Sequence, residues 1–214
     1  MSVERPPRLY VIAGVNGAGK SSIAGATFRA LGSDYFNPDE AARRLMTVNP
    51  ALSQNAANGV AWRQGVRLLR RAIEERLAFA FETTLGGNTI THLLAQAARK
   101  GIEVHIWYVG LSSPALHLER VRARVSRGGH DIPEADIRRR YEHSRLNLIA
   151  LLPHLTALRI HDNSEEADPA AGKVPLPVLG LQMERGKILG PPDLWRTPDW
   201  AKPIVAAALK LPRS

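Results

Sequence analysis

The 214-residue chain contains no cysteine, which excludes disulfide bonds and cysteine-based metal sites. It also has no uninterrupted apolar run near the ~18 residues that a membrane span needs, so we expect no membrane partner. The first eight residues, which include Pro6 and Pro7, lack the apolar core of a secretion signal. These absences are compatible with the reducing cytoplasm, and we expect a cytoplasmic protein.

Aromatic residues are also scarce, at 6% of the chain, whereas the net charge reaches +9. A basic balance is compatible with nucleic acid or with any polyphosphate partner. Eight arginines fall between Arg120 and Arg145, around Gly128-Gly129, which indicates one local phosphate-facing element, although solvated helix faces can also account for many of them. Because few aromatics are available to stack on bases, nucleic acid is the less favoured partner.

The most informative stretch is Gly14-Val15-Asn16-Gly17-Ala18-Gly19-Lys20-Ser21, which matches the G-x-x-x-x-G-K-[ST] phosphate loop. It follows an apolar run over residues 9–13 and precedes a helical pattern over residues 22–31, which is the context that the motif requires. Lys20 can reach the β- and γ-phosphates of ATP, and the Ser21 hydroxyl can ligate Mg²⁺. The residues expected to bind ATP are Gly14, Asn16, Gly17, Ala18, Gly19, Lys20, Ser21 and Ser22.

Strand-like and helix-like segments alternate through the first 165 residues. This alternation predicts an α/β fold of the P-loop NTPase type, with a parallel sheet and helices on both faces. The expected strands are 9–13, 34–37, 78–82, 102–111 and 155–160. The expected helices are 22–31, 38–46, 55–77, 88–99 with Asn88 or Thr89 as its cap, 113–127 with Ser113 as its cap, and 133–152.

The composition changes after residue 165, and we predict two parts. Residues 1–165 are expected to form a P-loop kinase domain with a helical lid around residues 115–145. Residues 166–214 are expected to form a small C-terminal appendage packed on the same domain, with a hairpin over 174–189 and a short helix over 199–209. Trp195 and Trp200 are the expected anchors of this appendage.

Polar groups follow three other expected strands, at the edge of the sheet where such folds bind ligands. Asp39 suits a general base for a substrate hydroxyl, but a carboxylate favoured by a helix N-terminus explains it equally well. Glu82, with Thr83 and Thr84, can hold the substrate, and Glu82 can also position Mg²⁺ through water. Asp162 and Asn163 end the last strand of the domain.

The expected lid carries arginines on both arms of its Gly-Gly turn. Arg124 and Arg140 lie on the two arms, and their planar guanidinium groups suit the stabilisation of a transferring phosphoryl group. His130, beside the turn, is either a donor to a substrate phosphate or an ordinary loop residue. The other histidines lack the spacing of metal ligands, so we expect no histidine metal site.

Taken together, these motifs resemble the zeta-toxin family of P-loop kinases over about residues 9–165. The matching segments are Gly14 to Ser21, Asn37-Pro38-Asp39-Glu40, Phe81-Glu82-Thr83-Thr84, Arg124-Val125, Gly128-Gly129-His130-Asp131-Ile132-Pro133, Arg139-Arg140-Tyr141, Asn147 and Asp162-Asn163-Ser164. The resemblance implies a kinase that uses ATP and Mg²⁺ to phosphorylate a hydroxyl. It places the base at Asp39, the substrate-loop carboxylate and threonine at Glu82 and Thr84, and the lid arginines at Arg124 and Arg140.

The best-known members of that family phosphorylate the 3′-hydroxyl of UDP-N-acetylglucosamine and are held inactive by a small helical antitoxin. This chain departs from them in its Asn-Pro-Asp-Glu motif, which is typical of a broader zeta-like branch, and at Thr83, where those kinases tend to have glycine. We therefore predict a small-molecule kinase whose acceptor is UDP-N-acetylglucosamine or a related nucleotide sugar, with an antitoxin as a possible partner. The alternatives are a nucleotide-gated binding module and a nucleic-acid 5′-hydroxyl kinase.

Overall fold

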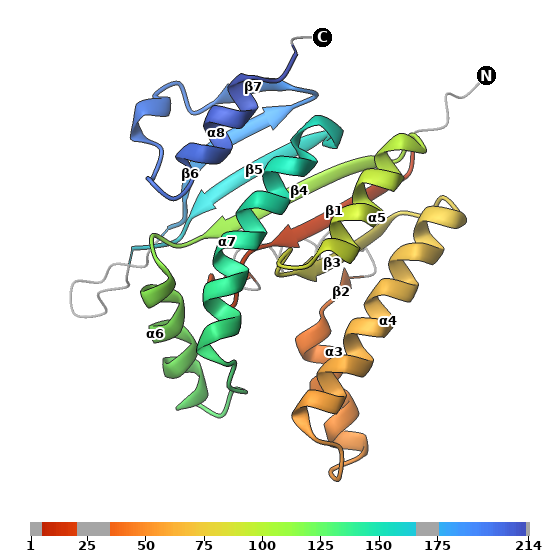
Figure 1. Ribbon diagram of the computed structural model, residues 1–214. Coiled ribbons are helices and arrows are strands. Elements are labelled where there is room, and N and C mark those ends of the chain that lie inside the picture. Colours follow the sequence, from red (N-terminus) through yellow and green to blue (C-terminus); the bar gives the residue numbers. More distant parts are fainter. Residues whose placement is uncertain (1–5, 21–34, 166–175, 213–214) are drawn as a thin grey trace.

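The computed structural model describes residues 6–20, 35–165 and 176–212 of the chain. Seven strands in these residues form one sheet in the order β2-β3-β1-β4-β5-β6-β7 (Figure 1). The strands are β1 (Arg8–Ala13), β2 (Tyr35–Phe36), β3 (Phe79–Thr83), β4 (Glu103–Gly110), β5 (Ala157–Asp162), β6 (Val178–Glu184) and β7 (Lys187–Gly190). Strands β1 to β5 pair with one another in parallel, whereas β6 is antiparallel to β5 and β7 is antiparallel to β6. The predicted α/β fold with a parallel sheet is therefore confirmed.

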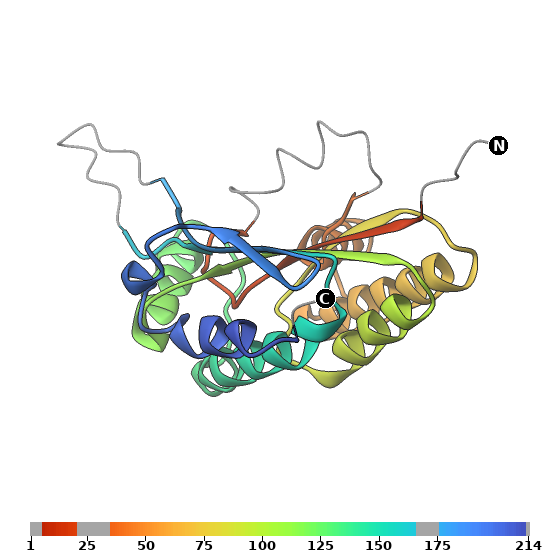
Figure 2. The ribbon, with the colours of Figure 1, turned by 90° about the horizontal axis from the view of Figure 1, so that it is seen from above.

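The α-helices of the described residues are α3 (Pro38–Val48), α4 (Gln54–Glu74), α5 (Asn88–Arg99), α6 (Pro114–Val125), α7 (Glu134–Leu151) and α8 (Lys202–Leu209). In Figure 2, α4, α5, α7 and α8 lie on one side of the sheet. The helix predicted over residues 22–31 lies outside the described residues. No helix in the described part of the chain is long and apolar enough to cross a membrane.

The phosphate loop follows β1, an inner strand of the sheet. Val11, Ile12 and Ala13 have no exposed surface, as expected for a strand that has parallel neighbours on both edges. Ala13 is paired with Thr83 of β3, so the loop that follows β1 and the loop that follows β3 leave the sheet side by side. The carboxyl edge of the sheet thus gathers the segments in which the sequence predicts a site.

Local sequence signals account for most helix starts. Asn37 caps α3, with Pro38 in the first turn, and the Ser113 hydroxyl caps α6 by accepting from the Leu116 amide at 3.2 Å. The prediction that Asn88 or Thr89 caps α5 is wrong. The chain is still extended at Gly87, which is the cap residue, and it offers no side chain to the helix amides.

The C-terminal segment extends the sheet. The predicted hairpin is confirmed: β6 pairs with β5, and β7 returns along β6 after a turn at Arg185 and Gly186. Trp200 is an anchor as predicted, because it is 4% exposed and donates to the Asp162 carboxylate at 3.0 Å. Trp195 is not, since it is 74% exposed and contacts the guanidinium of its neighbour Arg196. The division of the chain at residue 165 stays a prediction.

Gly110, the last residue of β4, provides a test of this packing. A methyl group at this position would overlap the ring of Trp200, which is held by Asp162 and cannot easily move. Gly110→Ala is therefore expected to lower the free energy of unfolding by about 2 kcal/mol or more, the usual cost of overpacking. Gly190→Ala, where no atom lies within 4 Å of the added methyl, is the control. Equal denaturation midpoints for the two variants would contradict this packing.

Candidate active site

The phosphate loop is braced by side chains from distant elements. Gly17 and Gly19 both have φ of +84°, a conformation that favours glycine and lets the backbone curl. Asn163, which follows β5, donates its Nδ2 to the Ala18 carbonyl at 2.9 Å. Asn163 therefore has a structural task at the loop. Ser21 and Ser22, predicted to bind Mg²⁺ and phosphate, lie outside the described residues.

Asn16 connects the phosphate loop to both helices of the predicted lid. Its carbonyl accepts a hydrogen bond from Nδ1 of His117 in α6 at 2.8 Å, and its Oδ1 accepts one from Arg140 in α7 at 2.9 Å. Burial lowers the pKa of His117 to about 4, because desolvation of the charged ring outweighs the bond to Asn16. The ring is therefore neutral at physiological pH and carries its proton on Nδ1, where the carbonyl fixes it.

Lys20 is buried beside an acid. Its Nζ lies 3.5 Å from Oε1 of Glu82 and donates to the Val15 carbonyl at 3.3 Å. Both side chains are less than 10% exposed, so each charge depends on the other for stabilisation. Oε2 of Glu82 also accepts hydrogen bonds from Tyr35 at 2.8 Å and Asn37 at 3.1 Å. The structure thus places Glu82 next to the lysine of the phosphate loop.

Asp39 meets one of the predicted lid arginines. Nη1 of Arg124 lies 3.8 Å from Oδ2 of Asp39, while its Nη2 donates to the His130 carbonyl at 3.1 Å. Gly128 turns the chain between them with φ of +86°. Burial lowers the pKa of the His130 imidazole, an effect that the nearby Asp39 carboxylate opposes. The Gly-Gly segment therefore holds Arg124 and His130 against the acid predicted as the base.

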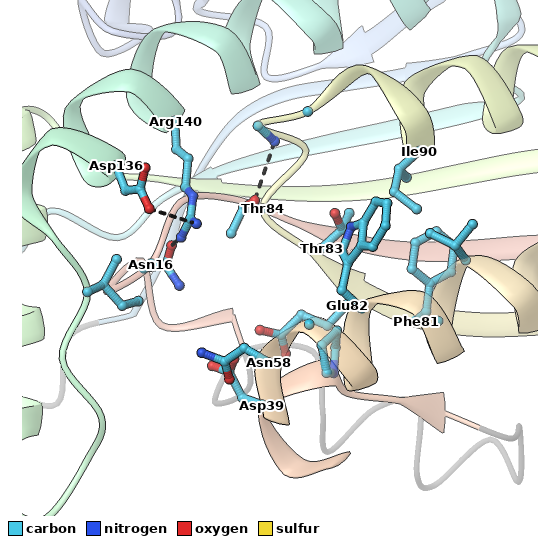
Figure 3. Close-up of a pocket in the computed structure, with 18 of the residues that line it drawn as sticks. Asn16, Asp39, Asn58, Phe81, Glu82, Thr83, Thr84, Ile90, Asp136 and Arg140 are labelled. Carbon is cyan, nitrogen blue, oxygen red and sulfur yellow. Dashed lines mark hydrogen bonds and ion pairs between the residues drawn. The ribbon is translucent and has the colours of Figure 1, made fainter. Parts of the chain in front are cut away.

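Arg140 faces the same space from the other arm. Its guanidinium bonds Asn16 and lies 3.4 Å from Asp136, and burial lowers its pKa. Figure 3 shows Arg140, Asp136 and Asn16 on one side of the cavity, across from Asp39 and Glu82. A positive group thus faces two carboxylates across the cavity, and it is placed to stabilise negative charge there.

The loop after β3 is fixed by hydrogen bonds that the sequence did not reveal. The Thr83 hydroxyl accepts from the Leu85 amide at 3.1 Å, and the Leu85 backbone has φ of 54°, an unusual value for a residue with a side chain. Ser144 of α7 donates to the Thr84 carbonyl at 2.7 Å, and Asn147 donates to the Leu85 carbonyl at 2.8 Å. Helix α7 therefore sets the shape of this loop.

These elements enclose a cavity of about 430 Å³ at the carboxyl edge of the sheet (Figure 3). No described residue after Arg140 lines it, so strands β6 and β7 and helix α8 leave it open. The predicted site residues that line it are Asn16, Lys20, Asp39, Glu82, Thr83, Thr84, His130 and Arg140. Arg124 does not line the cavity, but its guanidinium lies 3.8 Å from the Asp39 carboxylate.

Several lining residues escaped prediction. Trp62 belongs to a helical pattern typical of a buried stripe, yet it is 51% exposed at the cavity, beside Asn58 of the same helix. Asp136 lies 3.4 Å from Arg140, and its position four residues earlier on the same helix was the signal that could have indicated this pair. Asn37, which does not line the cavity, stood in the motif that supports the family resemblance, but nothing in the sequence indicated its bond to Glu82. Within the described residues, no group of three His, Cys, Asp or Glu side chains can hold a metal ion.

The sequence also matches a known protein family over most of its length. The family model described as Zeta toxin matches residues 2–168. The chain belongs to the zeta toxin family. This confirms the resemblance predicted from the sequence and, at the level of the family, the expected class of enzyme, a phosphotransferase. An uncharacterized protein of Haemophilus influenzae is 33% identical over 132 residues, which are 60% of this chain and 88% of that protein.

Solved structures support the same fold. The AvrRxo1-ORF1:-ORF2 crystal structure with ATP has a TM-score of 0.67 at 14% identity, covering 97% of this chain and 65% of that chain. A structure from the PezAT chromosomal toxin-antitoxin system of Streptococcus pneumoniae has a TM-score of 0.55 at 16% identity, covering 74% and 69%. The chain thus spans about two thirds of the length of these relatives, and at such identities the likeness concerns the fold.

The buried His117 predicts a pH dependence of stability. Its folded pKa of about 4 lies below the ordinary value near 6.5, so below that value the unfolded state binds the proton more readily. The contribution to stability is complete above about pH 6.5 and falls by about 3 kcal/mol as the pH approaches 4. The free energy of unfolding, measured with urea at several pH values, should lose this part of its pH dependence in His117→Asn. It should keep it in His143→Asn, because His143 lies on the exposed surface of α7. Identical slopes in wild type and His117→Asn would contradict the assignment.

Proposed function

We propose that this protein is an ATP- and Mg²⁺-dependent kinase that phosphorylates a hydroxyl group of a small molecule. The observation that carries the proposal is that Lys20 of the phosphate loop and the carboxylate of Asp39 line one open cavity. Phosphoryl transfer needs little covalent help from a protein, and it depends on positioning and on charge stabilisation. A cavity lined by both a phosphate-loop lysine and a carboxylate meets both needs.

In this proposal the donor side of the cavity binds ATP. The amides of the loop from Gly14 to Lys20 accept the phosphates, and Lys20 exchanges its contact with Glu82 for the β- and γ-phosphates. The Ser21 hydroxyl would help to hold Mg²⁺, an ion that favours oxygen ligands and keeps several waters. When bound, the ion would neutralise charge on the phosphates. Glu82 would orient waters of the ion or the acceptor.

On the acceptor side, Asp39 accepts the proton of the attacking hydroxyl. Arg124 and Arg140 approach from the two arms of the lid and stabilise the charge that develops on the transferred group. Thr83, Thr84 and His130 line the same wall and supply polar contacts to the acceptor. The carboxylate of Asp39 also fits the first turn of α3, and this favourable position is compatible with its proposed role.

The proposed acceptor is UDP-N-acetylglucosamine or a related nucleotide sugar. This proposal rests on family membership and on the character of the cavity wall beyond Asp39, where the ring of Trp62 is exposed and Asn55 and Asn58 offer carboxamides. An aromatic face and amides are typical partners for sugar and base rings. A small helical antitoxin is proposed as a partner, since one similar fold belongs to a toxin-antitoxin system.

The direct test separates binding from chemistry. Lys20→Ala is expected to abolish transfer and to weaken ATP binding strongly, because it removes the charge that faces the phosphates. Asp39→Ala is expected to lower kcat by about 10²- to 10⁴-fold while the Kd of ATP stays near the wild-type value. Calorimetry with ATP and Mg²⁺, together with ³¹P NMR of reactions with nucleotide sugars, measures the two quantities. Full activity of Asp39→Ala would remove this residue from the role of base.

Trp62 tests the acceptor side. Trp62→Ala is expected to raise the KM of the acceptor by about fivefold and to leave the KM of ATP unchanged, because a ring contact of this kind contributes about 1 kcal/mol. Trp195→Ala is the matched control, since that indole is also exposed but lies outside the cavity wall. An acceptor KM that is equal in the two variants would place the acceptor elsewhere.

A further inference from the structure

Both the oxygen and the nitrogen of the Asn37 carboxamide form hydrogen bonds. Asn37 joins β2 to α3 and is 7% exposed. Its Oδ1 accepts hydrogen bonds from the amides of Asp39 at 2.8 Å and Glu40 at 3.2 Å. Since backbone amides can only donate, the oxygen of the carboxamide must point at the helix and the nitrogen must point away from it. That nitrogen donates to Oε2 of Glu82 at 3.1 Å.

These bonds form one continuous path across the active site. From the first turn of α3, which carries Asp39, the path runs through Asn37 to Oε2 of Glu82. It leaves through Oε1 of Glu82 to Nζ of Lys20, 3.5 Å away. The path crosses β2, β3 and β1, which are adjacent in the sheet. It therefore joins the acid on the acceptor side to the lysine on the donor side.

We propose that Asn37 is a positioning residue for phosphoryl transfer, whose carboxamide fixes the helix turn of Asp39 relative to Glu82 of β3. The inference rests on the kinase activity proposed above. Reaction rates are sensitive to such alignment, and a displacement of about 1 Å can reduce a rate by about 10²-fold. The buried path, with three bonds to Asn37 alone, holds the two sides at one separation before ATP binds.

Helix capping alone does not account for asparagine at this position. Serine residues cap α4 and α6 in this protein, and aspartate caps as well as asparagine does. A carboxylate can cap α3 but cannot donate to Glu82, and a serine hydroxyl is shorter by one atom. Only a carboxamide accepts from the helix with one end and donates to a carboxylate with the other. Variants at position 37 can therefore keep the helix cap while they remove the link, which is the hydrogen bond from Asn37 to Glu82.

The first test is Asn37→Ser, which keeps a cap, adds no charge and removes the donor to Glu82. The assay uses ATP, Mg²⁺ and UDP-N-acetylglucosamine as the acceptor; if that sugar is not phosphorylated, hydrolysis of ATP by water is measured instead. In either assay kcat is expected to fall about 10- to 100-fold. The KM of ATP and the midpoint of thermal unfolding are expected to stay near wild type. Ser53→Ala, which removes the side-chain cap of α4, is the control and should keep wild-type kcat.

The second test reverses the polarity of the link. Asn37→Asp keeps the cap but sets two carboxylates against each other, so kcat should fall at least as far as in Asn37→Ser. Adding Glu82→Gln restores the wild-type charge and a hydrogen bond, now donated by position 82. Glu82→Gln alone also lowers kcat, because it removes the charged partner of Lys20. The double variant should therefore have about tenfold higher kcat than the product of the two single losses predicts, which a double-mutant cycle measures.

The outcomes that overturn the inference are distinct. Wild-type kcat in Asn37→Ser, or a double-mutant cycle without coupling between positions 37 and 82, removes the positioning role and leaves the kinase proposal intact. A loss of kcat matched by loss of folding in both Asn37→Ser and Asn37→Asp shows a structural role only and overturns it too. A wild-type protein that turns over no ATP with any acceptor or with water overturns the proposed function and this inference together.

Discussion

The buried pair of Lys20 and Glu82 is the interaction on which the site depends. Two charges with less than 10% of their surface exposed are stable only if each has a close partner, and removal of one partner leaves the other at a cost of several kcal/mol. Tyr35, Asn37 and the Val15 carbonyl complete the environment of the pair. The lysine that we propose to bind phosphate is thereby held in an ordered position by its carboxylate partner.

The topology of the sheet brings these groups together. Because β2, β3 and β1 are adjacent and parallel, the residues that follow them meet at one edge, although Lys20, Asn37 and Glu82 are far apart in the sequence. Helices α6 and α7 approach the same edge and contribute His117 and Arg140, both of which bond Asn16. The phosphate loop is therefore shaped by the lid helices as well as by its own glycines.

Much of this could be predicted from the sequence, for physical reasons. The phosphate loop has a fixed spacing of glycines and lysine, and the strands that carry Asp39 and Glu82 to the edge are short apolar runs ended by polar residues. Such local patterns indicated Lys20, Asp39, Glu82 and Arg140, which the structure brings to one cavity. Contacts between different strands have no local signature, so the bond of Asn37 to Glu82 did not show. The pair of Asp136 and Arg140 is four residues apart on one helix, a local pattern that was overlooked. Trp195 was misjudged as an anchor, and Trp62 was not foreseen at the cavity, because periodicity and aromatic character do not reveal which side of a segment packs.

Four acidic residues, Asp39, Glu82, Asp131 and Asp136, line the cavity, and we assign the proton transfer to Asp39. A crystal structure with a non-hydrolysable ATP analogue, Mg²⁺ and the acceptor tests this most directly. The account predicts that the reacting hydroxyl lies about 2.6–3.2 Å from the Asp39 carboxylate and in line with the terminal phosphate, with Lys20 on the phosphates. A hydroxyl bound to Glu82 instead, with Asp39 turned away toward Arg124, would contradict it.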